Sequence, residues 1–256
     1  MANANWSKDE MILALNLYLK LPFGKFHSTT PEIIHLAKII GRTPSSVSMR
    51  LSNFASVDPY HQQRGIKGLT GGGKQVGIIW DEFIENKDDL IFESERILAE
   101  KEGKTIEVKY AKILEGTEIL VGKSKVREVK VRVNQNVFRQ IVMANYEKRC
   151  AITGISNADL LIASHILPWA QNENERLNPQ NGIALNGLHD RAFECGYITI
   201  TPDFKIKISS KLKKDIKDEI LKDYFIKYEN QPILMPKRFN PGLEFLKYHN
   251  DERFIP

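Results

Sequence analysis

The chain has 256 residues, of which 42% are hydrophobic and 27% are charged. This length suits one large domain or two modest ones with a proper core, and the composition excludes a disordered chain. No apolar stretch approaches the roughly 18 residues of a membrane-spanning helix, and the opening MANANWSKDE lacks a signal-peptide pattern. We therefore expect a cytoplasmic protein with no membrane partner.

Charge and cysteine content narrow the function classes further. A net charge of +5 is compatible with nucleic acid as a partner, although many basic proteins bind none. The cysteines are Cys150 and Cys195, and the lack of any CxxC pair excludes a structural zinc site made of four cysteines. We interpret both as small buried residues, because disulfides are uncommon in the cytoplasm.

The first 84 residues are interpreted as one helical domain. Ser7 and Glu10 have the spacing of a capping box and predict a helix that continues into MILALNLYLKL. Pro31 begins a second segment with helical periodicity, and Gly41 is the residue type that ends such a helix.

A third helix is expected directly after this short turn. Thr43 has the residue type of a helix cap, and Pro44 suits the first helical position. The inward stripe of this helix is predicted to be Val47, Leu51 and Phe54. Two helices joined by a glycine-containing turn resemble a helix-turn-helix, so we predict a helix-turn-helix or winged-helix-like domain that recognises DNA. An ordinary helical hairpin with a polar face is the alternative.

The candidate DNA contacts of this domain are small polar and basic side chains. Some lie at the start of the third helix, and others lie in the basic glycine-rich stretch RGIKGLTGGGKQVG, residues 64–77. That stretch lacks the GxxxxGK[ST] pattern of a P-loop and is interpreted as a basic loop or wing, or as a plain surface loop. The predicted contacts are Arg42, Ser45, Ser46, Arg50, Lys67 and Lys74.

The rest of the chain divides into a charged connector over residues 85–125 and a second domain with a C-terminal extension over residues 126–256. The second domain opens with VREVKVRV, whose alternation of apolar and charged residues predicts a strand with one wet face. An amphipathic helix, FRQIVMANYEKRC, is expected to follow.

A strand–loop–strand–helix arrangement is predicted next. Leu160 to His165 is interpreted as a strand, Gly182 to Leu185 as a second strand, and Gly187 to Cys195 as the beginning of a helix. The histidine at the end of the first strand makes this a ββα arrangement. The fold class is therefore predicted to be α+β.

Four linked blocks of this region, CAITG, ASHILPW, ERLNPQNGIAL and HDRAFECGYITI, resemble the HNH endonuclease family in its restriction-type branch. The resemblance implies a ββα-metal nuclease in which His165 is the general base and Asn181 orients the loop and the histidine. It implies that Asp190 binds a divalent cation, Mg²⁺ or Mn²⁺, and that His189 either ligates too or faces inward. Neutral imidazole suits the base, because its unperturbed pKa is near 6.5, and carboxylate oxygen suits these cations.

The chain departs from the family pattern at two positions. Ser164 precedes the base where many members have an acidic metal ligand, and Glu194 stands where aspartate is common in this branch. We predict a metal-dependent DNA endonuclease of the restriction or defence type, which acts on double-stranded DNA as a homodimer. The alternative is a DNA-binding regulator with a decayed nuclease fold, and an RNA-directed nuclease or toxin is less favoured.

Overall fold

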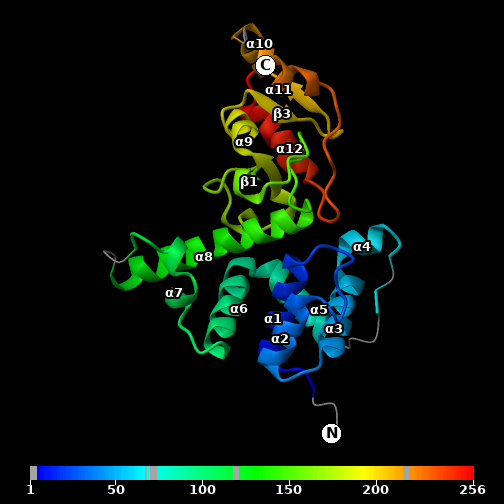
Figure 1. Ribbon diagram of the computed structural model, residues 1–256, viewed down its shortest axis with the longest axis vertical. Helices are drawn as coiled ribbons and strands as arrows, with labels where there is room; N and C mark the ends of the chain where they lie inside the picture. Colours follow the sequence, from blue (N-terminus) through cyan, green and yellow to red (C-terminus); the bar gives the residue numbers. More distant parts are fainter. Residues whose placement is uncertain (1–4, 67, 70–73, 118–120, 216–218) are drawn as a thin grey trace. The chain divides into compact units, whose positions relative to one another are not determined.

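The computed structural model describes residues 5–66, 68–69, 74–117, 121–215 and 219–256. The chain divides into two compact units, Met1–Val137 and Phe138–Pro256. Its class is α+β, as predicted: the described residues of the first unit are helical, and the second unit combines helices with two small antiparallel sheets (Figure 1). No helix in the described parts of the chain has the length and apolar character to cross a membrane.

The first unit is a cluster of helices around a central one, α1. Its elements are α1 (Lys8–Lys20), α2 (Pro31–Ile40), α3 (Pro44–Val57), α4 (Pro59–Gln63), α5 (Lys74–Glu85), α6 (Lys87–Lys101), α7 (Ile106–Lys109), the short η2 (Ala111–Ile113) and the first part of α8 (Gly122–Asn145). Helix α1 packs against α2, α3, α5 and α6. Apolar residues are buried on every side of it, which a surface helix with one apolar stripe would not show.

The predicted start and stop signals of these helices are confirmed. The Ser7 hydroxyl accepts from the Glu10 amide at 3.2 Å, and the Glu10 carboxylate accepts from the Ser7 amide at 2.7 Å. Gly41 ends α2 in the left-handed region with a φ of 69°, and the Thr43 side chain caps α3. The inward stripe of α3 is fully buried at Val47, Leu51 and Phe54.

Helices α2 and α3 form a helix-turn-helix hairpin. The described residues of the first unit include no strand, so the winged variant of the prediction finds no support there. Part of the predicted basic loop, Lys67 and residues 70–73, lies outside the described residues.

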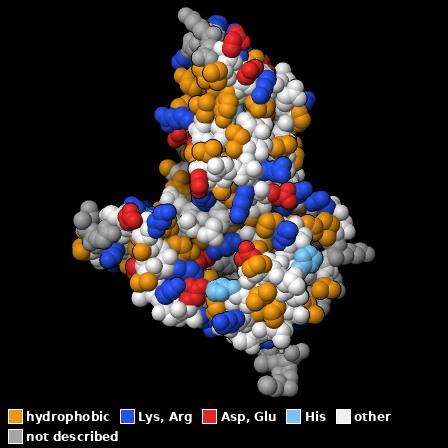
Figure 2. Space-filling model, in the orientation of Figure 1, with side chains coloured by type: hydrophobic (Ala, Val, Ile, Leu, Met, Phe, Trp, Pro, Cys, Tyr) orange, Lys and Arg blue, Asp and Glu red, His pale blue; other side chains and the backbone are white. Residues whose placement is uncertain are grey.

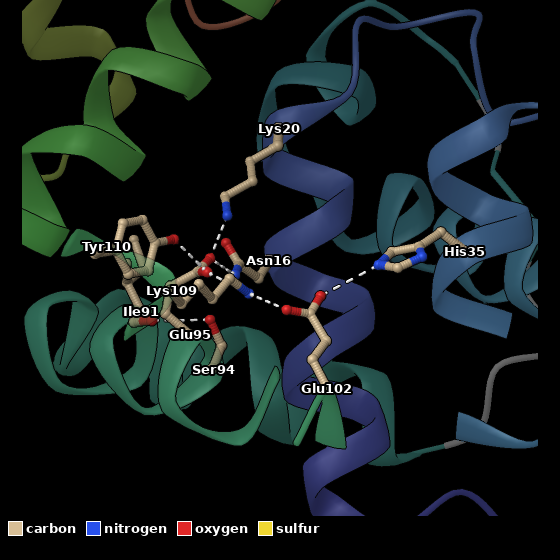
Figure 3. Close-up of polar contacts among 9 residues, drawn as sticks. All are labelled: Asn16, Lys20, His35, Ile91, Ser94, Glu95, Glu102, Lys109 and Tyr110. Carbon is tan, nitrogen blue, oxygen red and sulfur yellow. Dashed lines mark hydrogen bonds and ion pairs between the residues drawn. The ribbon is translucent and has the colours of Figure 1, made fainter. Parts of the chain in front are cut away.

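Helix α6 belongs to the first unit, although the sequence placed its residues in a connector. It packs against α1 and brings the buried Glu95 carboxylate to four side chains, one of which is Lys109 at 3.4 Å (Figure 3). Asn16 donates to this carboxylate at 2.5 Å, Tyr110 donates to it at 2.5 Å, and Lys20 forms an ion pair with it. These contacts join the end of α7 to α1 and α6 in one packed cluster.

Helix α8 replaces the strand that the sequence predicted over residues 126–133. Val129, Val133 and Val137 follow one another at intervals of four residues, and all three are buried. The same stripe continues to Ile141. A spacing of four residues places these side chains on one face of a helix, whereas a half-buried strand would bury every second residue. Val126, with which the apparent alternation begins, is 65% exposed.

The second unit confirms the predicted strand–loop–strand–helix. Strand β1 (Leu161–His165) pairs antiparallel with β2 (Gly182–Asn186), in a register that places His165 opposite Gly182. Helix α9 (Gly187–Glu194) follows β2 directly, because the Asn186 side chain caps it by accepting from the amides of Leu188 and His189.

The remaining elements of this unit surround that motif. They are the short η3 (Ala158–Leu160), η4 (Glu173–Glu175) and η5 (Pro179–Asn181), the hairpin of β3 (Ile198–Ile200) and β4 (Ile206–Ile208), α10 (Ser210–Asp215), α11 (Glu219–Phe225), η6 (Ile226–Tyr228), α12 (Leu243–Tyr248) and the π-helical η7 (His249–Arg253). Helix α9 packs against β1, β2 and β3, and η7 packs against β3.

Candidate active site

His165 ends β1, and its imidazole is fixed on two sides. The Nε2–H donates to the carbonyl oxygen of Arg176 at 2.9 Å. The ring stacks on Phe138, with centroids 3.9 Å apart and planes 12° apart. The opposite residue, Gly182, leaves room for this stack, since a Cβ there would lie 2.8 Å from the Phe138 ring. Burial lowers the pKa of His165 below 6.5, although the Arg176 carbonyl opposes the shift.

Asn181 joins the two ends of the loop that carries this carbonyl. Its side-chain oxygen accepts from the Leu167 amide at 2.7 Å. Its side-chain nitrogen donates to the carbonyls of Leu167 and Glu175, both at 3.1 Å. The side chain is buried and fully occupied, so Asn181 positions the loop and touches no open space. This geometry agrees with the orienting role that the family resemblance implies.

A cavity of about 280 Å³ opens beside the base. The residues of its wall that bear on chemistry come from β1, α9 and the C-terminal segment. They are Ser164, His165, Asp190, Glu194, His249 and Arg253. The structure therefore brings the predicted base and the predicted metal-binding carboxylate to one cavity.

Asp190 lies one turn into α9 and is not the cap of that helix, because Asn186 has that role. Burial raises the pKa of Asp190, and the hydroxyl of Ser164, which donates to this carboxylate, partly offsets the shift. Glu194 follows one turn later and lines the same cavity, with its carboxylate paired to Arg191 at 2.8 Å. The cavity thus contains two carboxylates and one hydroxyl as oxygen donors.

His189 does not join Asp190 at this cavity, which corrects its prediction as a metal ligand. Its Nδ1 accepts from the Asn186 side chain at 2.8 Å, and its Nε2–H donates to the Tyr224 carbonyl at 3.0 Å. The ring stacks on Tyr224 and is buried, and burial lowers its pKa to about 4. Both nitrogens are occupied inside the protein, so His189 faces inward.

His249 and Arg253 are cavity residues that sequence reasoning missed. They lie in HNDERF, which matches no motif, and more than fifty residues separate them from α9. His249 stacks on Phe193, its Nε2–H donates to the Phe193 carbonyl at 3.1 Å, and its Nδ1 bonds the Thr199 hydroxyl at 2.8 Å. Local pattern offers no signal for such a partner, because only the packed fold brings it near.

The candidate DNA contacts of the first unit divide into two groups. Arg42 forms a bidentate ion pair with Glu10, at 2.9 and 2.8 Å, and its side chain is 14% exposed. Arg42 and Arg50 lie 4.6 and 4.7 Å from the Trp6 ring, and burial lowers the pKa of Arg50. These two guanidinium groups therefore join the α2–α3 turn and α3 to Trp6 and Glu10 at the beginning of the chain, which corrects the expectation that they face DNA.

The other candidate contacts stay at the surface or cannot be placed. Ser45 and Lys74 are exposed, Ser46 is half-buried, and Lys67 lies outside the described residues. Figure 2 shows Lys and Arg side chains interspersed with Asp and Glu side chains on this face of the unit. A basic surface is thus not concentrated on the visible face of the first unit.

These observations define a class of site. A strand pair and a helix present a fixed imidazole, an adjacent carboxylate and a positioning asparagine around one cavity, as in a ββα nuclease. Residues 150–201 match the family model described as HNH endonuclease. A search of the curated proteins found no match.

Proposed function

We propose that the protein is a metal-dependent HNH deoxyribonuclease of the restriction or defence type, with His165 as its general base. One observation carries this proposal. The second unit contains three histidines of the same design, each stacked on an aromatic ring and each donating Nε2–H to a main-chain carbonyl. In His189 and His249 the second nitrogen is also bonded, whereas His165 has no described partner at Nδ1 and lines the cavity.

This arrangement specifies how a proton would move. The Arg176 carbonyl only accepts, so the neutral ring of His165 carries its proton on Nε2 and leaves Nδ1 as the basic nitrogen. Because burial lowers its pKa, the imidazole is neutral at pH 7 and ready to accept a proton from water. The water oxygen bonds to phosphorus, the P–O3′ bond breaks, and the O3′ oxygen takes a proton from solvent. The products are a 5′-phosphate and a 3′-hydroxyl.

The donor set of the cavity fits a hard divalent cation. Asp190 has a raised pKa because burial isolates its charge, so a cation beside it would relieve this cost. Asp190 and Glu194 supply carboxylate oxygens, and Mg²⁺ is commonly bound by one or two carboxylates while it retains several waters. When bound, such a cation supplies charge neutralisation for the phosphate. Among the described residues no group of three histidine, cysteine or acidic side chains could hold a metal by itself.

We further propose that the first unit supplies recognition of double-stranded DNA through the beginning of α3. Ser45 is exposed there, and small side chains let a helix end approach phosphates and base edges. Lys74, at the beginning of α5, adds an exposed positive charge. Ser45→Glu and Lys74→Glu should weaken duplex binding in a fluorescence anisotropy titration, and exposed Lys104→Glu is the matched control. Equal affinities for all three variants would contradict this assignment.

A homodimer is part of the same proposal. One active site cuts one strand, so a double-strand cut is favoured by two sites related by a two-fold axis. Sedimentation of the protein with and without duplex DNA measures this directly, and a monomer on cleaved duplex would contradict it.

The proposed activity is tested with supercoiled plasmid and with modified and unmodified genomic DNA, in Mg²⁺ or Mn²⁺. We expect nicking by the wild-type protein and a loss of about 10²- to 10⁴-fold in His165→Ala, the range for removing a general base. His27→Ala, which changes an exposed histidine of the first unit, should cleave as the wild type does. The proposal fails if no DNA is nicked in either metal, or if His165→Ala cleaves at the wild-type rate.

One observation favours a second candidate, a DNA-binding regulator with a decayed nuclease fold. Ser164 occupies the position before the base and donates to Asp190, where many family members place a second acidic ligand. Tight duplex binding without any nicking, together with no heat of Mn²⁺ binding in calorimetry, would support the regulator over the nuclease.

A further inference from the structure

The C-terminal segment is anchored along the nuclease helix α9 and the strand that follows it. His249 bonds both the Phe193 carbonyl and the Thr199 hydroxyl. Asn250 donates to the Ile200 carbonyl at 2.7 Å. His249 and Asn250 lie outside the segment that matches the family model, residues 150–201, whereas their three partners lie within it. The C-terminal segment therefore forms part of the cavity wall from outside the matched segment.

Gly196 makes the close approach of this segment possible. It follows α9 with a φ of 75°, and a Cβ at this position would lie 2.0 Å from the Arg253 carbonyl oxygen. The Gly196 carbonyl in turn accepts from the Ile255 amide at 2.9 Å. Any larger residue would push the segment away from α9. The main chain thus fixes residue 253 beside the cavity independently of its side chain.

Among the residues that the structure describes, the Arg253 side chain has one main-chain hydrogen bond and forms no ion pair. Its Nη2 donates to the Glu194 carbonyl at 2.8 Å. The carboxylate of Glu194, which also lines the cavity, pairs with Arg191 instead. Arg253 is exposed and lines the cavity together with His165 and Asp190. A guanidinium has five donors, so four N–H groups of Arg253 have no described partner.

We propose that Arg253 is a catalytic residue that binds the scissile phosphate. Guanidinium is planar and matches two oxygens of a phosphate at once, which a single ammonium does not do. In the cavity it would donate to the non-bridging oxygens, whose negative charge grows as water attacks phosphorus. The hydrogen bond to the Glu194 carbonyl orients the guanidinium group, and its remaining donors would bind the phosphate oxygens. This inference rests on the nuclease activity proposed above.

The test compares single-turnover cleavage of a labelled duplex in Mn²⁺ by four proteins. Arg253→Ala should lower the rate about 100-fold, the typical cost of removing a donor to transition-state charge, with less than about threefold change in duplex affinity measured in EDTA. Arg253→Lys should recover part of the rate, because it restores charge without the bidentate fork. Lys247→Ala, which removes an exposed charge from α12, should match the wild type.

Free guanidinium ion separates a catalytic role from a structural one. Added at millimolar concentration, it should accelerate Arg253→Ala and leave His165→Ala unchanged, because only the first variant has a vacancy of that shape. Thermal unfolding of Arg253→Ala should match the wild type, since the main-chain bonds of Gly196 remain. The inference is overturned if Arg253→Ala cleaves within about threefold of the wild type, or if Ala and Lys variants are equally slow without rescue. If the wild-type protein cleaves no DNA, the proposed function fails and this inference fails with it.

Discussion

The buried Glu95 of the first unit and the buried His189 and His249 of the second unit are held in opposite charge states. The first unit buries charge: the Glu95 carboxylate is 1% exposed and contacts two ammonium groups, with Lys20 paired to it and Lys109 at 3.4 Å. Burial by itself raises the pKa of Glu95, but these lysines outweigh it and bring the pKa to about 2. The second unit buries neutral imidazoles, and burial lowers the pKa of His189 and of His249 to about 4.

This difference separates a charged contact that stays constant from imidazole groups that can titrate. A carboxylate with two lysines remains charged at any ordinary pH, so its contacts are constant. An imidazole bonded to a carbonyl keeps one nitrogen as a donor and leaves the other to accept a proton. In the second unit that second nitrogen is occupied in two histidines and has no described partner in the third, so one design provides both structure and chemistry.

The largest expected effect comes from removing the buried negative charge of Glu95 in the first unit. Glu95→Gln leaves the partly buried Lys20 without its counter-charge and Lys109 with only the Glu102 carboxylate, at 3.7 Å. We therefore expect the free energy of unfolding to fall by about 3–5 kcal/mol. Glu93→Gln is the matched control, since it removes an exposed pair with Arg96 on the same helix and should cost less than about 1 kcal/mol. Urea unfolding of the full chain measures both. Equal losses in the two variants would show that the buried cluster has no special role.

The second prediction uses acid to distinguish the units. The folded-state pKa of His189 and of His249, about 4, lies below the unfolded value of 6.5. Their stabilisation is therefore complete above pH 6.5 and is lost as pH falls from 6.5 to 4, by about 3 kcal/mol for each histidine. For Glu95 the stabilisation is present above pH 4.5 and is lost as pH falls from 4.5 to 2.

Hydrogen exchange resolved by peptide follows this acid response in each unit. After correction for the intrinsic rate, amides of the second unit should lose protection between pH 6.5 and 4 while those of the first remain protected. His249→Gln should weaken the pH dependence, and His27→Gln should leave it unchanged because that side chain is exposed. Earlier loss of protection in the first unit would reverse the comparison.

The third prediction disturbs the neutral network around the base. Asn181→Ala leaves both main-chain groups of Leu167 and the Glu175 carbonyl without their partner, so the loop should release the carbonyl that orients His165. We expect about 100-fold slower cleavage, because misplaced catalytic groups cost this much. The acidic limb of the pH–rate profile should shift to lower pH, since the Arg176 carbonyl raises the pKa of His165.

Asn174→Ala is the control for this variant, because Asn174 is exposed in the same loop. It should retain both the rate and the pH profile. A slower Asn181→Ala enzyme with an unshifted profile would mean that this residue supports folding and does not orient the base.

The smallest expected effect concerns the metal and tests Ser164, which stands where many family members have an acidic ligand. Ser164→Asp places a second carboxylate beside Asp190, so the Mn²⁺ concentration for half-maximal cleavage should fall about tenfold. Ser164→Ala removes the hydroxyl that donates to Asp190 without adding a ligand, and it should show no such gain. An unchanged Mn²⁺ requirement in Ser164→Asp would place the cation away from this strand end.

Much of the fold could be predicted because its signals are local. The capping box of Ser7 and Glu10, the left-handed Gly41 and the Thr43 cap each depend on residues within a few positions. The ββα motif and the family resemblance could be predicted for the same reason. The pairing of β1 with β2 confirms the motif, and the family-model match over residues 150–201 confirms the resemblance. The strand predicted over residues 126–133 was wrong because the window was too short to show that the apolar stripe repeats every four residues.

The sequence by itself determined the helix ends and the ββα motif, because short-range spacing encodes them. Only the tertiary structure decided which nitrogens are occupied. It turned His189 inward, placed Arg42 and Arg50 over the Trp6 ring, and brought Arg253 to the cavity. Hydrogen bonds and ring contacts between residues distant in sequence determine these placements, and no local sequence pattern encodes them.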